Sequence, residues 1–149
     1  FDGNGNFIGG EYFNLDSRRE VQGLEADASW NISGAFSLTA NYSKLATNSD
    51  DSFARIPKEK WGMALGFNPD ETSHLQLAYQ FTGERRASPY SEIFLKEYSL
   101  VNLTARKEFM KKRLSIYGAV SNLFDTEFIG VEGFTTMGRN FNLGLEYKF

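Results

Sequence analysis

Residues 140–149, NFNLGLEYKF, alternate apolar and polar side chains without a break. One set consists of Phe141, Leu143, Leu145, Tyr147 and Phe149, and the positions between them carry Asn, Gly, Glu or Lys. A period of two is typical of a β-strand whose two faces meet different surroundings. This stretch therefore predicts a strand and gives the pattern to look for in the rest of the chain.

The same alternation recurs through most of the sequence, whereas helical spacing is nearly absent. It is regular in residues 20–32, 36–43, 61–68, 74–81, 101–106 and 114–120, and less regular in residues 7–15. Residues 100–112 also fit a short helix, but their Val and Thr and the flanking strands favour a sheet. The sequence predicts an all-β fold, an antiparallel meander of about eight strands.

The connections between these stretches alternate in length. Short ones rich in Gly, Pro, Asn or charge fall at residues 31–35, 68–72 and 109–112, and long ones at residues 46–57, 83–95 and 123–138. Short turns would then lie at one end of the sheet and long loops at the other. That layout is typical of an outer-membrane barrel, which has short periplasmic turns and longer extracellular loops.

The side chains on the two faces favour the same interpretation. Aromatic rings fall near both strand ends, as in the interfacial girdles of membrane barrels. The rings are Trp30, Phe36, Phe67, Phe109, Tyr147 and Phe149 at the short-turn end, and Tyr42, Trp61, Tyr79, Phe81, Tyr98 and Phe141 at the long-loop end. The opposite face is too polar for a packed core and suits a wet lumen. It carries Glu25, Asp27, Asn41, His74, Gln76, Gln80, Asn102, Arg106, Asn142 and Glu146.

Composition excludes several classes of function. The 149 residues include 16 Lys and Arg against 19 Asp and Glu, so the chain lacks the basic excess of a nucleic-acid binder. There is no Cys, and His74 is the only His, so neither a thiolate nor a multi-histidine metal site is expected. No catalytic Ser, Lys or phosphate-binding loop is apparent. We expect no cofactor, no resident metal and no enzymatic activity.

Several ordered motifs resemble the C-terminal part of the barrel of a TonB-dependent outer-membrane receptor. They run in order along the sequence: Tyr12-Phe13-Asn14, Gly23-Leu24-Glu25, Leu38-Thr39-Ala40-Asn41-Tyr42, Arg55-Ile56-Pro57, Tyr98-Ser99-Leu100-Val101, Leu114-Ser115-Ile116-Tyr117, Asn122-Leu123-Phe124-Asp125 and Gly138-Arg139-Asn140-Phe141. The resemblance implies a plugged barrel of about 22 strands. The whole chain, residues 1–149, would be its last third, without the plug domain and most of the barrel. A start at Phe1 rather than Met fits such a piece, or a removed targeting signal.

The resemblance also implies a function. The resemblance implies import of a scarce nutrient across the bacterial outer membrane, driven through TonB acting on the plug. Substrates of this family include iron chelates, haem, cobalamin, nickel chelates and some glycans, and an iron chelate (siderophore) is the cargo expected here. The implied partners are the nutrient ligand, TonB, outer-membrane lipid and lipopolysaccharide, and the barrel-assembly machinery.

Candidate ligand-binding residues lie on the expected extracellular loops. Guanidinium groups match the paired oxygens of carboxylate, catecholate or phosphate, and aromatic rings can stack on a ligand. The candidates are Arg55, Arg85, Arg86, Arg139, Tyr90, Phe128 and Phe134, with Arg18 and Arg19 on or beside the same loops. Contact with lipopolysaccharide phosphate, or simple solvation, is the alternative for each arginine, and packing of the loops against one another is the alternative for Tyr90, Phe128 and Phe134.

The predicted strand at residues 140–149 also contains the candidate assembly signal. Leu143, Leu145, Tyr147 and Phe149 form an alternating apolar edge that suits recognition by strand addition.

Two alternatives stay open from the sequence. The chain could be a complete eight-stranded outer-membrane barrel with an adhesin or structural role, in which residues 7–15 pair with the last strand. It could instead be a soluble ligand-binding β-barrel, in which the apolar set is shielded from solvent.

Overall fold

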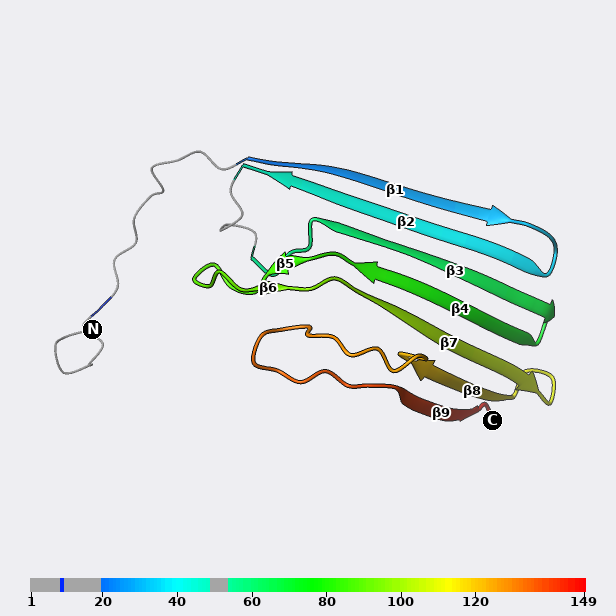
Figure 1. The fold of residues 1–149 in the computed structure, drawn as a ribbon. Coiled ribbons are helices and arrows are strands. Elements are labelled where there is room, and N and C mark those ends of the chain that lie inside the picture. Colours follow the sequence, from blue (N-terminus) through cyan, green and yellow to red (C-terminus); the bar gives the residue numbers. More distant parts are fainter. Residues whose placement is uncertain (1–8, 10–19, 49–53) are drawn as a thin grey trace.

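The computed structural model of the protein describes residue 9 and residues 20–48 and 54–149. Within these residues the chain forms nine strands, seven of them in one antiparallel sheet (Figure 1). The sheet order is β1 (Val21–Asn31), β2 (Phe36–Thr47), β3 (Glu59–Asp70), β4 (Ser73–Thr82), β7 (Tyr98–Phe109), β8 (Leu114–Ser121) and β9 (Asn140–Tyr147). The two short strands β5 (Arg85–Arg86) and β6 (Phe94–Leu95) pair with each other.

The predicted all-β antiparallel meander is confirmed. Each of the seven regular stretches coincides with a long strand, although residues 20–32 and 140–149 extend past the ends of β1 and β9, and each long strand pairs with the next long strand along the chain. Apart from Gly9, the predicted strand at residues 7–15 lies outside the described residues. Among the residues described there is no helix with the length and apolar character needed to cross a bilayer.

The strand register aligns the two faces across the whole sheet. Pairing places one apolar residue of every long strand in a single transverse row, and the neighbouring positions form a row of small and polar residues on the opposite face. The apolar row is Trp30, Leu38, Leu65, Leu77, Leu103, Val120 and Phe141. The polar row is Asn31, Ser37, Gly66, Gln76, Thr104, Ala119 and Asn142.

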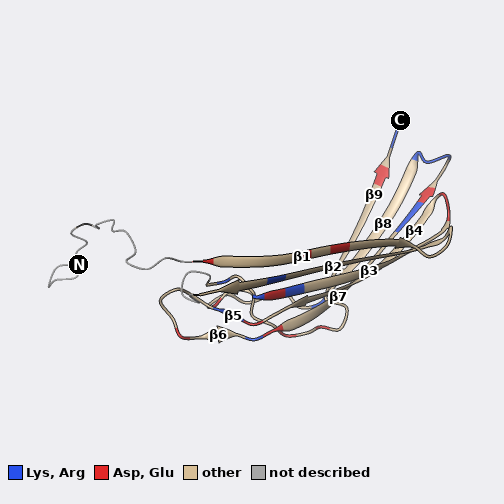
Figure 2. Ribbon diagram, turned by 90° about the horizontal axis from the view of Figure 1, so that it is seen from above, with Lys and Arg blue, Asp and Glu red and all other residues tan. Residues whose placement is uncertain are grey.

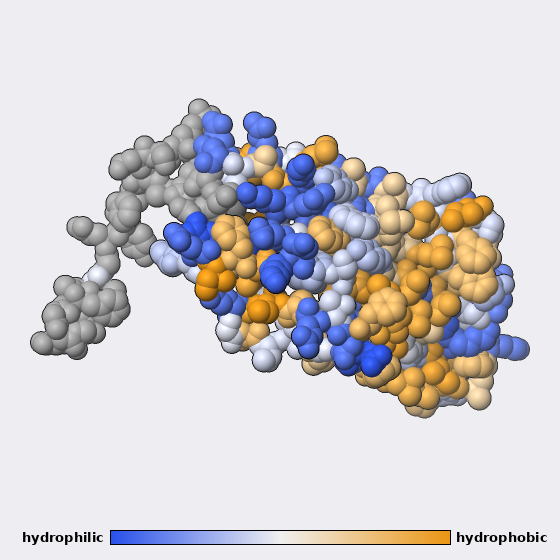
Figure 3. Space-filling model, viewed as in Figure 1, coloured by the Kyte–Doolittle hydropathy of each residue, from blue (hydrophilic) through white to orange (hydrophobic). Residues whose placement is uncertain are grey.

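The apolar face is exposed. Leu143 of β9 is 84% exposed, and Leu24, Met63 and Leu77 on other strands are exposed as well. In the described residues the buried hydrophobic side chains are Leu95 of β6 and Ala87, which directly follows β5. Figure 3 shows apolar surface gathered over the strands and hydrophilic surface toward the long-loop end. This exposure is the reverse of what a soluble barrel requires and suits a face covered by lipid.

The polar face accommodates its larger side chains with glycine. The ring of Tyr117 on β8 lies over Gly144, its partner on β9, and a Cβ at residue 144 would clash with that ring. Only glycine therefore leaves room for this ring position. Nearby, Arg106 donates to Ser115 at 2.9 Å and pairs with Glu108 and Glu146 at 3.3 and 3.5 Å.

The predicted alternation of connections is confirmed. Short turns join β1 to β2, β3 to β4 and β7 to β8, and long connections span residues 48–58, 83–97 and 122–139. The long connections lie at the same end of the sheet (Figure 1). Viewed from above, the sheet is twisted and curved, and β8 and β9 run steeply across the direction of β1 (Figure 2).

Asp70, the last residue of β3, organises the β3–β4 turn. Its carboxylate accepts from the Thr72 hydroxyl at 2.6 Å, the Ser73 hydroxyl at 2.8 Å, the Thr72 backbone N–H at 2.8 Å and Lys107 Nζ at 3.1 Å. These donors stabilise the ionised form and hold the pKa of the Asp70 carboxyl below its usual range. The turn is thereby tied to β7 across β4.

The aromatic rings lie near the strand ends as predicted, with one correction. Phe36 stacks on Phe67 at 4.5 Å near the short turns, and Trp61 lies 4.8 Å from Tyr79 near the long loops. Tyr98, expected in the long-loop girdle, pairs instead with Thr82 and lies on the polar face. The apolar positions of β7 are odd-numbered, so residue 98 falls on the other side.

Candidate functional site

The three long connections are fastened to one another rather than standing apart. The small β5–β6 hairpin lies within residues 83–97, the middle connection, and it contacts both of the others. Its neighbours are the described part of residues 48–58 on one side and residues 122–139 on the other. The hairpin therefore links the three long connections.

Arg85 connects the middle connection to the last one. Its side chain is buried, with only 6% of the residue exposed, and Nη2 donates to the carbonyl oxygens of Ile129 and Gly130, both at 2.9 Å. Nη1 is also buried and has no hydrogen-bond partner in the described residues. The guanidinium instead lies over the ring of Tyr98, 5.4 Å from its centroid, where cation–π attraction applies.

Phe128 completes this contact. It stacks on Tyr98 with ring centroids 4.3 Å apart and an interplanar angle of 28°. Arg85, Tyr98 and Phe128, with the two carbonyls that Arg85 binds, are called the loop clasp below. The loop clasp joins β5, the start of β7 and the connection between β8 and β9, so three separate parts of the chain meet there.

Arg55 connects the first long connection to the middle one. Its backbone N–H donates to the carbonyl of Arg86 at 2.7 Å, and its Nε donates to the carbonyl of Ala87 at 3.2 Å. The backbone of Arg55 has a φ of 69°, a value that non-glycine residues adopt only when surrounding contacts hold it. Arg86 in turn donates from Nε to the Ser91 carbonyl at 2.5 Å.

Asn122 anchors the base of the last connection. It is 4% exposed, donates from Nδ2 to the Thr126 carbonyl at 2.9 Å and accepts from the Thr126 N–H at 2.8 Å. Its φ of 52° lies in the left-handed region, which Asn tolerates better than most residues. Its own N–H donates to Asn102 Oδ1 on β7 at 3.0 Å, so the turn is fixed to the sheet.

Asp125 joins the two ends of that connection. Its Oδ1 accepts from the Arg139 N–H at 2.7 Å, and a Cβ at residue 138 would stand 2.6 Å from the same oxygen. Gly138 therefore allows the carboxylate to approach the backbone. The motif Asn122-Leu123-Phe124-Asp125, noted in the sequence only as part of a resemblance, has a structural role of closing this loop.

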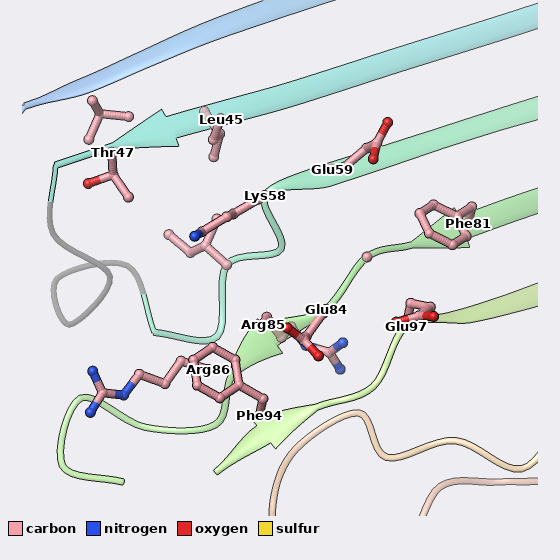
Figure 4. Close-up of a pocket in the computed structure, with 13 residues that line it drawn as sticks. Leu45, Thr47, Lys58, Glu59, Phe81, Glu84, Arg85, Arg86, Phe94 and Glu97 are labelled. Atoms are coloured by element: carbon pink, nitrogen blue, oxygen red, sulfur yellow. The ribbon is translucent and has the colours of Figure 1, made fainter. Parts of the chain in front are cut away.

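Two hollows lie among these connections. A cavity of about 300 Å³ opens where β2 and β3 meet the hairpin, between Leu45 and Thr47 above and Arg86 and Phe94 below (Figure 4). Its charged lining balances Lys58, Arg85 and Arg86 against Glu59, Glu84 and Glu97. A larger groove of about 1010 Å³ lies between residues 93–97 and 125–138. Its lining combines Phe94, Phe128 and Phe134 with Lys96, Glu97, Asp125, Glu127 and Glu132.

The structure divides the predicted ligand residues into two groups. Arg85 and Phe128 belong to the loop clasp, and Arg55 and Arg86 each use Nε to hold loop backbone. Tyr90 and Phe134 are 97% and 72% exposed, and the exposed Arg139 reaches the Leu123 carbonyl at 3.4 Å with one nitrogen. Arg18 and Arg19 lie outside the described residues. A ligand role for each stays a prediction.

Sequence reasoning missed Tyr98, Asn122 and Asp125 as site-forming residues. A signal was present for Asn122 and Asp125, because Asn and Asp tolerate positive φ and are frequent at turns. Tyr98 carried no such signal, since its place in the sequence also suits a girdle.

Of the candidate assembly residues, Leu143, Leu145 and Tyr147 share one face of β9, and Phe149 follows two residues after the strand ends. Leu143, Leu145, Tyr147 and Phe149 are all exposed, and within the described residues β9 pairs only with β8. Tyr147 and Phe149 meet edge to face at 5.2 Å.

Metal-ligating residues do not gather in the part of the chain that the structure describes, where no three His, Cys, Asp or Glu side chains form a group able to hold an ion. The exposed His74 instead places Nδ1 2.5 Å from the Asn68 side-chain oxygen.

Comparison with known proteins assigns the fold. Residues 1–123 match the family described as TonB dependent receptor-like, beta-barrel. Similar solved structures include the siderophore receptor PiuA from Acinetobacter baumannii, with a TM-score of 0.73 and 14% identity over 88% of this chain. The ferric-catecholate import receptor Fiu from E. coli K12 gives 0.70 and 16% over 87%, and the copper transporter OprC gives 0.71 and 13% over 88%.

The chain spans 22%, 21% and 24% of the length of PiuA, Fiu and OprC, respectively. Its curved antiparallel sheet, short turns and long loops are those of a barrel wall. The chain belongs to the TonB-dependent receptor family, as part of the β-barrel of a bacterial outer-membrane receptor.

Proposed function

We propose that the chain forms part of the wall of a transporter that binds a scarce nutrient at the cell surface and imports it, with energy delivered through TonB. The remainder of the barrel and the plug domain would be supplied by residues beyond this chain. The single observation that carries this proposal is the set of long connections, which are fastened together at one end of the sheet. They hold exposed Arg and aromatic side chains where a ligand would arrive.

An iron chelate is the proposed cargo. PiuA and Fiu are named as a siderophore receptor and a ferric-catecholate import receptor, which supports this choice. The exposed side chains of Tyr90, Phe134 and Arg139 are those left available for a chelate, since rings stack on aromatic ligands and guanidinium groups bind paired oxygens. The proposed role is that of a receptor and not of an enzyme.

The charge of the larger groove limits where an anionic chelate would sit. Four carboxylates and one lysine line this groove, so an anionic group would be repelled from it. We therefore place the anionic part of the chelate against the exposed Arg139, which does not line the groove. Its aromatic or aliphatic part would reach Phe134.

Uptake of radiolabelled iron chelates tests this function. Cells that produce the full-length receptor and are limited for iron should take up at least one catecholate or hydroxamate chelate, and a strain lacking TonB should not. Substituting Tyr90, Phe134 and Arg139 together by Ala should lower uptake about tenfold or more, because each lost contact is worth about 1 kcal/mol.

The matched control is Glu71→Gln, which removes an exposed charge from a short turn at the opposite end of the sheet. Uptake should be unchanged in that variant. Copper salts form a separate arm, since OprC has a similar fold. TonB-dependent copper uptake without any chelate uptake would overturn the choice of cargo, and no TonB-dependent uptake of either would overturn the proposed function.

We also propose that the exposed face of β9 is the surface by which the barrel-assembly machinery adds this strand. Phe149→Ala in the full-length receptor should reduce the amount of folded receptor in the outer membrane several-fold, because the exposed apolar side chain that follows the end of β9 is lost. The measurement is the heat-modifiable band in outer-membrane fractions. Asn142→Ser, on the opposite face of β9, should leave that band unchanged, and equal loss in both variants would contradict the proposal.

A further inference from the structure

The three short turns at one end of the sheet differ in charge. Residues 32–35, between β1 and β2, carry no charged side chain. The β3–β4 turn contains Glu71 and directly follows Asp70, the last residue of β3. The turn between β7 and β8 is Met110-Lys111-Lys112-Arg113, called the basic turn below. It stands out in blue beside β8 in Figure 2. Among the three short turns, the basic turn is therefore the one that carries Lys and Arg.

The backbone of the basic turn presents its side chains to the surroundings. Met110, Lys111 and Lys112 have φ values of 51°, 55° and 69°, and the Arg113 N–H donates back to the Met110 carbonyl at 3.2 Å. The left-handed conformation is unfavourable for residues other than Gly or Asn, and here three successive residues adopt it. All four side chains are exposed.

The charges of the basic turn are not compensated by the protein that the structure describes. Other cations near this end have acidic partners: Lys107 pairs with Asp70 at 3.1 Å, and Lys148 pairs with Glu146 at 3.7 Å. No ion pair within the described residues involves Lys111, Lys112 or Arg113. These three cations are available to an external anion.

Exposed apolar side chains adjoin the basic turn. Phe109 and Met110 precede the cations directly, and Tyr147 of β9 pairs with Leu114, the first residue after the turn. Phe109 and Tyr147 belong to the apolar face of the sheet. Cations that begin where an exposed apolar face ends fit the boundary between hydrocarbon and headgroups, where long basic side chains reach the phosphates. An anionic protein in the periplasm would have no need of these apolar neighbours.

We propose that the basic turn binds the headgroup phosphates of anionic phospholipids at the periplasm-facing surface of the outer membrane. The inference rests on the outer-membrane barrel fold, in which short turns face the periplasm, and not on the identity of the cargo. Each cation near an anionic membrane surface contributes up to about a fivefold gain in affinity. Bound lipid would fix the height of this end of the barrel against the bilayer.

Lipid binding to the full-length receptor in detergent tests the proposal. Native mass spectrometry gives apparent Kd values for phosphatidylglycerol and for phosphatidylcholine with the same acyl chains. The receptor should bind phosphatidylglycerol about tenfold or more tightly. In the variant Lys111→Asn, Lys112→Asn, Arg113→Gln this preference should disappear, whereas binding of phosphatidylcholine should stay the same. Asn keeps the left-handed conformation that the turn needs.

Two control variants accompany this measurement. Lys111→Arg with Lys112→Arg keeps the charge and should keep the preference, and it serves as the readout if the neutral variant fails to fold. Glu71→Gln removes a negative charge from the β3–β4 turn and should not weaken the preference for phosphatidylglycerol. A preference for phosphatidylglycerol that survives neutralisation would overturn the proposal. Displacement of the lipid by millimolar inorganic phosphate would also overturn it, because it would indicate a general phosphate site. These readouts are independent of uptake, so failure here leaves the proposed function untouched.

Discussion

Arg85→Ala should release residues 122–139 from the middle connection and leave the sheet itself intact. The substitution removes two charged hydrogen bonds, to the carbonyls of Ile129 and Gly130, and the cation–π contact with Tyr98. A hydrogen bond to a charged group is worth about 1.5–3 kcal/mol, so closure of this loop should weaken by about 3–5 kcal/mol. Glu127 and Glu132 are exposed on this loop, and a Glu-specific protease added to intact cells should cut there at least ten times faster.

Two comparisons give this prediction its control. Lys96→Ala removes an exposed cation from the same connection as Arg85 and should not change the rate of cleavage. Arg85→Lys keeps the charge but presents a single ammonium instead of a planar fork, and it should give an intermediate rate. If Arg85→Ala is cut no faster than the unsubstituted receptor, the loop clasp does not hold the loop closed.

Asn122 should show the second large effect, which can be divided between its side chain and its backbone. Asn122→Gly keeps the left-handed conformation and loses both hydrogen bonds to Thr126, at a cost of about 2 kcal/mol. Asn122→Ala loses the same bonds and also requires Ala at a φ of 52°, which adds about 1 kcal/mol or more. Hydrogen exchange at the Thr126 amide should therefore accelerate about thirtyfold in the Gly variant and further in the Ala variant.

The exposed Phe124 lies in the same turn and supplies the matched control. Phe124→Ala should leave exchange at Thr126 unchanged, because the Phe124 side chain is 72% exposed and the two hydrogen bonds join Asn122 to Thr126. Equal exchange rates in the Gly and Ala variants would mean that the left-handed backbone contributes nothing, and an unchanged rate in both would mean that the side-chain bonds do not close the turn.

The strands were predictable because both of their faces constrain the sequence. The apolar face selects apolar side chains such as Phe141, and the other face selects small or polar ones such as Asn142. Every position of a strand therefore contributes to the alternation that identifies it. Short turns and long loops were predictable for a similar reason, since the lengths of the strands leave fixed intervals between them. Tyr98 was misplaced because a Tyr near a strand end suits a girdle and a packed loop equally, and only the register with Thr82 decides between them.

The contacts among the loops were not predictable in this way. Arg85 and Arg86 are adjacent arginines with the same apparent chemistry, yet the structure buries the first and leaves the second partly exposed. The difference depends on which carbonyls of residues 129 and 130 approach, across more than 40 residues of sequence. Contacts between residues so far apart in sequence leave no periodic pattern along the chain, so the sequence around Arg85 does not reveal its partners.

The transverse apolar row that runs from Trp30 through Leu65 to Phe141 has a consequence for how this protein can vary among bacteria. Adding or removing one residue within a strand would turn every later side chain of that strand to the wrong side, placing amides in hydrocarbon. Natural changes of strand length should therefore come in twos, or as a single residue absorbed by a bulge. The long connections do not alternate between two faces, so they can lengthen by an odd or an even number of residues as the receptor adapts to a new ligand.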